Sequence, residues 1–399
     1  MIPRLILDAL LIVVVGIWAA LGLAIVIDRR RFDRRTQRST SLQKRLHLAP
    51  GLASGAAREM TLAEFQEMVF SGLPSAVEAS LAHQLLARHG EEHLRALAEG
   101  TTAADNPTRV RALQVLVSAA HEGAHYALDR CLRSGNRELA SAAVRMLIRL
   151  DDRRAAVVLI DALCDGAYAA SRLAAAVDRM SVPRSELLAP LLTHANSTPR
   201  FWGVRLAGRL GAREWRPRVA ELTADPDPLV RRAAVETLGA IGEPKDRVLL
   251  LVRFLDPVPM VRVHAARASA AFATPEVADS LCELLRDPEW IVRAAARDAL
   301  QRVGEVATAA LTRALWDEDR FAANSAAEVL FLTGAALRRT RQMMMNPDDG
   351  DALRFVTRFL AVAGPLLQHA LVAQLGRIEA ARLRTLAAAG PSVAEGRPE

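Results

Sequence analysis

The chain has 399 residues, of which 51% are hydrophobic, 4% aromatic and 24% charged, and its formal net charge is +7. A composition this apolar excludes an intrinsically disordered chain, and three cysteines are too few for a disulfide-stapled secreted scaffold. The cysteines lie far apart in apolar helical surroundings, as small buried side chains do, and we expect neither disulfides nor a metal knuckle at Cys131, Cys164 and Cys282.

The first segment in chain order is an uncharged run of 19 residues from Ala9 to Ile27. As a helix it measures about 28 Å, close to the roughly 30 Å hydrocarbon core of a bilayer. We therefore expect residues 5–27 to form a transmembrane anchor. A cleavable signal peptide is the alternative, but its apolar core is usually shorter and is not followed at once by many arginines.

A basic cluster follows this run at Arg29, Arg30, Arg31, Arg34, Arg35 and Arg38. Residues 28–45 hold eight Lys or Arg against two Asp, and residues 46–399 hold 43 basic against 42 acidic residues. The positive-inside rule then places the N-terminus outside and the bulk of the chain in the cytoplasm. Residues 28–45 should also attract anionic lipid head groups. The nearly neutral remainder disfavours nucleic-acid binding, which needs a basic surface.

Residues 28–60 make up a basic juxtamembrane segment and a linker, and residues 61–104 are expected to form an N-terminal helical cap. Two Ser/Thr-x-x-Glu patterns predict capping boxes at helix starts, Thr61 with Glu64 and Ser75 with Glu78. A cap is needed because the terminal unit of a stacked protein would otherwise expose its apolar face.

The central region repeats itself with a step of 31 residues. Asp-Pro followed by Val-Arg occurs three times, with Asp225, Asp256 and Asp287 opening the pattern and Arg231, Arg262 and Arg293 closing it. Small residues keep the same step at Ala234, Ala265 and Ala296 inside helical apolar series. Self-similarity at this period predicts a solenoid, in which each unit buries its apolar face against its neighbours.

With its ending in Leu238-Gly239-x-Ile241-Gly242, this pattern resembles the HEAT repeat, particularly the variety named after phycobilisome lyases. The resemblance implies an all-α, HEAT-type α-solenoid over about residues 105–335, followed by a C-terminal helical cap at 336–389. It also implies a ladder in which the turn Asp of one repeat bonds the Arg of a neighbour. The alternative is a row of catalytic carboxylates, which we disfavour because the residues recur with the repeat and do not converge.

A His-Glu-x-x-His sequence at His121, Glu122 and His125 is the one motif that favours an enzyme. In zinc peptidases it places two ligands on one helical face, with the glutamate as base. Here the 31-residue register puts it near a turn, and no third ligand is evident. Deoxyhypusine hydroxylases and bilin lyases resemble the chain in repeat architecture alone, so we assign no cofactor and no reaction.

Aromatic residues near the starts of repeats are candidate contacts to a partner, namely Phe201, Trp202, Trp290, Trp316 and Phe321. The alternative is that they pack over the next turn. A second uncharged run, from Phe359 to Gly376, is broken by Gly364-Pro365, which favours two helices over a membrane span. Residues 390–399 are polar and rich in Pro and Gly, which predicts a disordered tail.

The sequence therefore predicts a single-pass, cytoplasm-facing HEAT scaffold of an inner membrane that binds partner proteins. The ratio of 50 Arg to 2 Lys is typical of a bacterial protein. The alternatives are a membrane-tethered metalloenzyme using His121, Glu122 and His125, and a binder of nucleic acid or anionic lipid.

Overall fold

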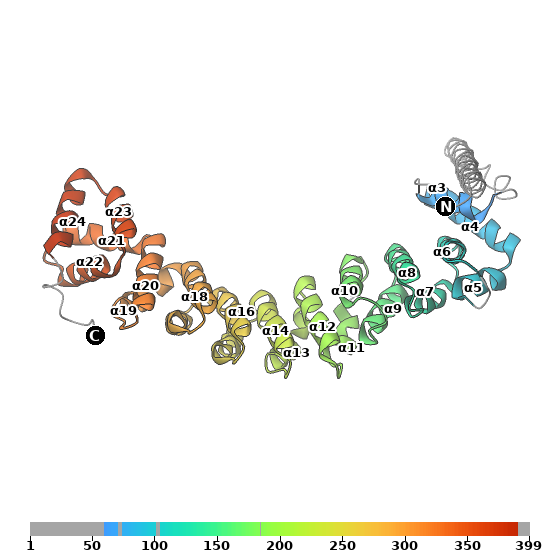
Figure 1. Ribbon diagram of the computed structural model, residues 1–399, viewed down its shortest axis with the longest axis horizontal. Coiled ribbons are helices and arrows are strands. Elements are labelled where there is room, and N and C mark those ends of the chain that lie inside the picture. Colours follow the sequence, from blue (N-terminus) through green and yellow to red (C-terminus); the bar gives the residue numbers. More distant parts are fainter. Residues whose placement is uncertain (1–59, 71–73, 101–103, 184, 390–399) are drawn as a thin grey trace, which may run out of the picture. The chain divides into compact units, whose positions relative to one another are not determined.

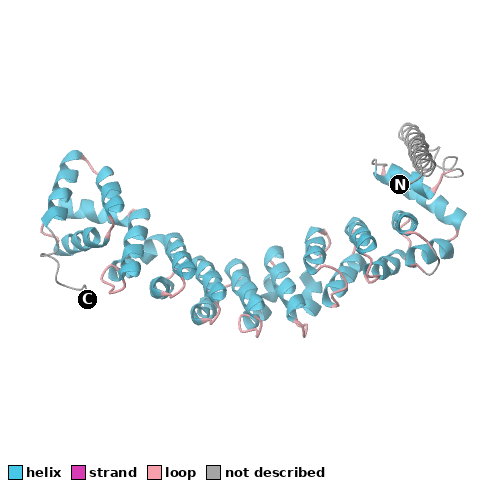
Figure 2. Cartoon of the chain, viewed as in Figure 1, coloured by secondary structure: helices cyan, strands magenta, loops and turns pink. Residues whose placement is uncertain are grey.

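The structure is a computed structural model that describes residues 60–70, 74–100, 104–183 and 185–389. The predicted anchor, the basic cluster and the predicted tail lie outside these residues. Within them every regular element is a helix, and none is a strand (Figure 2), which confirms the all-α prediction. No helix in these ranges is both long and apolar enough to cross a membrane.

The chain divides into two compact units, and the boundary in the sequence lies between residues 184 and 185. The described part of the first unit contains α3 (Leu62–Phe70), α4 (Ser75–His89), α5 (Glu91–Glu99), α6 (Asn106–Ser118), α7 (Ala124–Leu132), α8 (Arg137–Leu150), α9 (Arg153–Cys164) and α10 (Ala170–Arg179). Neighbouring helices pack pairwise, α5 on α6, α7 on α8 and α9 on α10.

The second unit contains a longer series of helices (Figure 1). Its α-helices are α11 (Ala189–Leu192), α12 (Ser197–Leu210), α13 (Arg216–Leu222), α14 (Pro228–Ile241), α15 (Arg247–Val252), α16 (Pro259–Ser269), α17 (Pro275–Glu283), α18 (Trp290–Val303), α19 (Thr308–Ala314), α20 (Arg320–Leu332), α21 (Ala335–Met345), α22 (Gly350–Val362), α23 (Pro365–Ala373) and α24 (Arg377–Ala389). Short 3-10 turns lie between them, η2 (Ser185–Leu188), η3 (Arg213–Trp215), η4 (Pro244–Asp246), η5 (Arg253–Leu255), η6 (Ala270–Phe272), η7 (Leu284–Arg286) and η8 (Gly304–Ala307).

The 31-residue step corresponds to one long helix, one turn and one shorter helix. Helices α12, α14, α16, α18 and α20 pack in sequence along one row, and α15, α17 and α19 pack along a second row. The repeated alanines Ala234, Ala265 and Ala296 are fully buried inside the first row. A Cβ atom on Gly239 would lie 2.9 Å from the Cβ of Ala268, so α14 and α16 approach too closely there for any larger residue.

Only one of the two predicted capping boxes is present. The Thr61 backbone N–H donates to Glu64 at 2.9 Å, and the Glu64 N–H donates to the Thr61 hydroxyl at 3.3 Å. The box at Ser75 is wrong, because Ser75 lies inside α4 and Pro74 stands at the N-cap. Glu78 is buried and accepts bonds from Ser118 and Arg149 on other helices, so tertiary contacts replace the local cap.

The uncharged run near the C-terminus is two helices, as predicted. Helix α22 ends at Val362 and α23 begins at Pro365, and Gly364 between them is the N-cap of α23. Gly364-Pro365 therefore separates the two helices of this segment.

Candidate partner-binding surface

The repeated Asp and Arg residues form a ladder between neighbouring repeats. Arg231 donates from Nε and Nη2 to both carboxylate oxygens of Asp256, at 2.8 and 3.0 Å. Its third nitrogen donates to the carbonyl oxygens of Asp225 and Pro226, at 2.9 and 3.0 Å. Each such arginine thus ties its own turn to the next one. The same two-pronged bond joins Arg200 to Asp225 and Arg262 to Asp287.

The geometry of these ion pairs indicates a structural role. The Asp256 side chain is fully buried and also accepts the Val258 N–H at 3.0 Å, so its oxygens face no open space. Burial by itself raises the pKa of the Asp256 carboxyl, but the bonds from Arg231 and Val258 outweigh it and leave the pKa below its ordinary value. Such a group stays charged at neutral pH, unlike a general base, which works best with a pKa near neutrality.

The ladder ends at Arg293, which departs from the prediction. Arg293 bonds the carbonyl oxygens of Asp287 and Pro288, as its counterparts do, but its guanidinium lies 5.5 Å from the centroid of the Phe321 ring. The next turn carboxylate, Asp317, is bound by Arg286 instead. The step from Asp287 to Asp317 is one residue shorter than the others, which moves the carboxylate out of register with Arg293.

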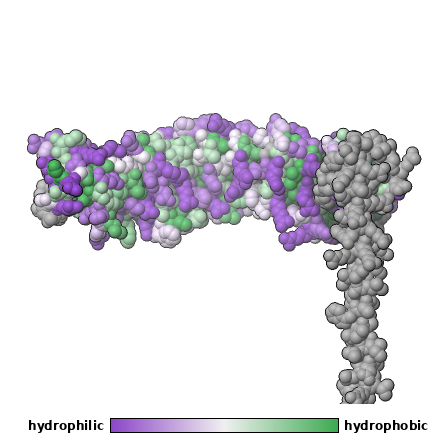
Figure 3. All heavy atoms as spheres, turned by 90° about the horizontal axis from the view of Figure 1, so that it is seen from above, coloured by the Kyte–Doolittle hydropathy of each residue, from purple (hydrophilic) through white to green (hydrophobic). Residues whose placement is uncertain are grey.

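Apolar side chains are exposed along the edge formed by these turns. Trp290 and Phe321 are 70% and 68% exposed, and Arg293 of the preceding turn lies against the Phe321 ring. Leu229, Met260 and Leu255 join them, at 52%, 38% and 88% exposure. We call these five residues, with the half-buried Ile291, the turn edge. The face shown in Figure 3 mixes hydrophilic and hydrophobic side chains.

The other three predicted aromatic contacts are less exposed. Phe201 and Trp202 lie in the middle of α12, are half-buried, and meet edge to face with their ring centroids 5.1 Å apart. Arg205 lies over both rings, at 5.7 and 5.9 Å. Trp316, at the turn after α19, is also half-buried. The structure therefore places Trp290, Phe321 and Trp316 at the turns between repeats, and it places Phe201 and Trp202 within α12.

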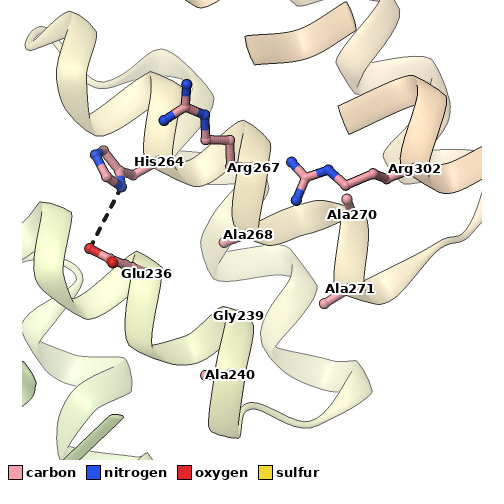
Figure 4. A pocket seen from close by; sticks show the side chains of 9 residues that line it. All are labelled: Glu236, Gly239, Ala240, His264, Arg267, Ala268, Ala270, Ala271 and Arg302. Carbon is pink, nitrogen blue, oxygen red and sulfur yellow. Dashed lines mark ion pairs between the residues drawn. The ribbon is translucent and has the colours of Figure 1, made fainter. Parts of the chain in front are cut away.

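A hollow of about 520 Å³ opens beside α14, α16 and α18 (Figure 4). Small residues form part of its wall, and Glu236, His264, Arg267 and Arg302 supply the charged and polar groups. His264 lies 3.7 Å from Glu236. Burial lowers the pKa of His264. The Glu236 carboxylate raises this pKa, and the positive charges of Arg232 and Arg267 lower it further. Arg267 and Arg302 are both exposed there, whereas tracking a phosphate backbone takes a longer basic surface.

The His-Glu-x-x-His sequence does not lie on one helical face. Helix α7 begins at Ala124, so His121 and Glu122 precede it in the turn while His125 lies in its first turn. His121 pairs with Glu91 at 3.0 Å, and His125 pairs with Asp152 at 2.9 Å. His121 thus connects the turn before α7 to the start of α5, and His125 connects α7 to the N-cap of α9. No group of three or more His, Cys, Asp or Glu within the described ranges is arranged to hold a metal ion.

A model of HEAT repeats matches residues 185–262 and 248–330. The second unit carries HEAT repeats. The match agrees with the stacked helices and with the ladder. It does not include residues of the first unit. The narrower likeness to repeats of the phycobilisome-lyase type stays a prediction. No curated protein matches the sequence.

Several solved structures are similar to this chain at low identity. An engineered protein is 16% identical over 83% of this chain and 98% of its own, with a TM-score of 0.35. Human deoxyhypusine hydroxylase in complex with glycerol is 17% identical over 63% of this chain and 99% of its own, with a TM-score of 0.26. Kap121p bound to Pho4p is 12% identical over 84% of this chain and 45% of its own, with a TM-score of 0.48. At TM-scores below 0.5 these likenesses assign neither an activity nor a partner.

Sequence reasoning missed the aliphatic members of the turn edge. Leu229 and Met260 are each the second residue of their helix, as are Ile291 and Phe321. Within the sequence they read as part of the apolar helical series that forms the core. The signal that could have found them is their offset, because each stands one residue before the buried position held by Val230, Val261 and Val292.

Proposed function

We propose that this protein is a scaffold that binds a partner protein through the turn edge of its HEAT repeats, with residues 5–27 holding it at a membrane. The observation that supports this is the exposure of Leu229, Met260 and Phe321 at the same place in three of four successive repeats, with Trp290 exposed in the fourth. Monomeric proteins scatter single apolar residues over their surfaces, but a row at equivalent positions is typical of an interaction site.

The chemistry of the edge suits protein recognition. Trp and Tyr, with Arg, dominate the binding energy of protein interfaces, and a tryptophan that is 70% exposed has most of its ring surface still to bury. Fully burying one large apolar side chain contributes about 1.5 to 3 kcal/mol. Burying Leu255, Trp290 and Phe321 together would contribute about 4.5 to 9 kcal/mol toward the roughly 4 to 15 kcal/mol that association costs.

The membrane part of the proposal rests on the sequence of residues 5–27 and on the arginines that follow. A tether would restrict the scaffold to a layer near the lipid surface, and so raise its effective concentration toward a partner held in the same membrane. Under the positive-inside rule this partner would face the cytoplasm.

A structural role for His121 and His125 fits their surroundings better than metal ligation. Each imidazole already faces a carboxylate from another helix, and three protein ligands would be needed around a catalytic zinc. We therefore place no catalytic step on this motif.

The proposal is tested by isolating the full-length protein from membranes together with the proteins bound to it. The native protein is compared with a double variant that carries Trp290→Ala and Phe321→Ala. Val248→Ala is the matched control, since Val248 is 56% exposed and lies on α15 in the other row. We expect the double variant to lose its co-purifying protein while its circular dichroism stays unchanged, and the control to keep it. Retention by the double variant at the native level would refute a role for the turn edge.

A further inference from the structure

The hollow beside α14, α16 and α18 exists because two repeats lack a long side chain that their neighbours have. One position recurs with the repeat as Arg209, Ala240, Ala271 and Arg302. Ala240 and Ala271 therefore stand in the wall of the hollow where the repeat before and the repeat after carry an arginine. Together with the other small residues of the wall, they leave open a volume of about 520 Å³ (Figure 4).

The size and the wall of this hollow are those of a small-molecule site. Sites for small ligands measure about 300 to 1,000 Å³ and combine an apolar wall with a few polar groups. Alanine and glycine form the apolar part here, and Glu236, His264, Arg267 and Arg302 supply the polar groups. Figure 4 shows the Arg302 side chain extended from α18 toward α16.

The cations around the hollow lack a carboxylate partner. Arg267 and Arg302 line it, and Arg205 and Arg232 lie close enough to lower the pKa of His264 in its wall. Among the residues that the structure describes, none of these four guanidiniums forms an ion pair, in contrast to those of the ladder. Arg205 lies over two aromatic rings, and the Nε atom of Arg232 is buried without a hydrogen-bond partner.

The charged side chains around the hollow carry a net positive charge. Its carboxylates are Glu236, which lies 3.7 Å from His264, and Asp298 on α18. Arg297 and Glu328 neutralise each other in an ion pair at 3.0 Å. The lowered pKa of His264 keeps its imidazole neutral at pH 7. The four unpaired guanidiniums exceed the two carboxylates by two charges, and a phosphate monoester carries about −1.5 to −2 at this pH.

We infer that this hollow binds a small soluble phosphate ester, with its phosphate facing Arg267 and Arg302 and its organic part against Ala240 and Ala271. Leu229 of the turn edge precedes Ala240 on α14 by 11 residues, which corresponds to about 16 Å along the helix. The hollow is therefore separate from the turn edge, and this inference does not depend on the proposed function.

The experiment is isothermal titration calorimetry of the full-length protein in detergent with butyl phosphate. This compound combines the charge of a phosphate monoester with a short apolar chain. We expect saturable binding at one site per chain. Inorganic phosphate has nearly the same charge but no apolar part, so it should bind at least about fivefold more weakly.

Two variants test the hollow itself. Arg302→Gln should weaken butyl phosphate binding at least about tenfold, because it removes a charged hydrogen-bond donor. Ala271→Leu should abolish binding, because it fills the hollow and leaves every charge in place. Both residues are exposed, and circular dichroism checks that the fold is kept. The controls are Arg341→Gln on α21 and Ala309→Leu on α19, which are exposed positions outside the hollow and should change the affinity by less than about twofold.

Each contrary result overturns a stated part of the inference. Absence of saturable binding up to about 10 mM butyl phosphate, or Arg302→Gln and Ala271→Leu binding as their controls do, would overturn the site. Equal affinity for inorganic phosphate would overturn the organic part of the ligand, and tighter binding of succinate would overturn the phosphate. A lipid head group presents the same chemistry, so phospholipid that co-purifies with the native protein but not with Ala271→Leu would overturn the soluble ligand.

Discussion

The pair formed by Arg231 and Asp256 offers the sharpest test of what holds successive repeats together. The carboxylate is fully buried and the arginine side chain is 11% exposed, so water screens the pair poorly. Arg231→Met keeps much of the apolar stem and removes four hydrogen bonds, two to Asp256 and two to the carbonyl oxygens of Asp225 and Pro226. What remains near Asp256 is the Val258 N–H and Arg253, 3.7 Å away.

Breaking a buried ion pair by removing one partner costs about 3 to 5 kcal/mol. Because Arg253 stays close enough to offset part of the buried, uncompensated charge of Asp256, we expect a loss of about 3 kcal/mol in the free energy of unfolding. The measurement is urea unfolding followed by circular dichroism, with hydrogen exchange to show that the loss concentrates in α14 and α16. In a solenoid the damage should centre on the repeats that share the pair.

Arg313→Met is the matched control, since its pair with Asp279 is about half exposed on both sides and such pairs contribute about 0 to 1 kcal/mol. The double variant Arg231→Met with Asp256→Asn should lose less than Arg231→Met alone, because no unpaired charge is left buried. A loss for Arg231→Met no larger than for Arg313→Met would refute the ladder as the link between repeats.

Further predictions follow from single contacts. Because the folded pKa of Asp256 lies below its ordinary value, its contribution to stability is present above about pH 4 and is lost as the pH falls through the folded pKa. The difference in unfolding free energy between the native protein and Arg231→Met should therefore narrow as the pH is lowered below about 4. Gly239→Ala should lower the unfolding free energy by about 1 to 3 kcal/mol through its clash with Ala268, whereas Gly350→Ala, with no atom within 4 Å, should be nearly neutral in the same urea titration. Burial raises the pKa of Cys282 to about 12, so iodoacetamide at pH 8 should label it at least about 100-fold more slowly in the folded chain than in urea, and equal rates would contradict the burial. His125→Ala should lower the melting temperature by removing the contact with Asp152 and leave the metal content measured by mass spectrometry unchanged, and a fall in zinc content would revive the metalloenzyme interpretation.

The sequence by itself determined the helical repeat and its step. A period of 31 residues with small residues in register can only be satisfied by stacking like units, because every unit then presents the same face to the next. The same period predicted the ladder of Asp and Arg residues, because residues that recur with the repeat lie next to their counterparts in the neighbouring turn. Where the period slipped by one residue, at Asp317, the predicted partner of Arg293 was lost and Phe321 took its place.

Tertiary structure decided which side chains face water. Leu229 and Val230 are adjacent and both apolar, yet the first is 52% exposed and the second fully buried, because α14 turns only one of them toward its neighbours. The sequence pattern at Glu78 predicted a local helix cap, but its carboxylate bonds to another helix. His121 and His125 matched a metal-binding motif, but they pair with Glu91 and Asp152. Such choices depend on contacts between residues distant in sequence, which a local pattern does not encode.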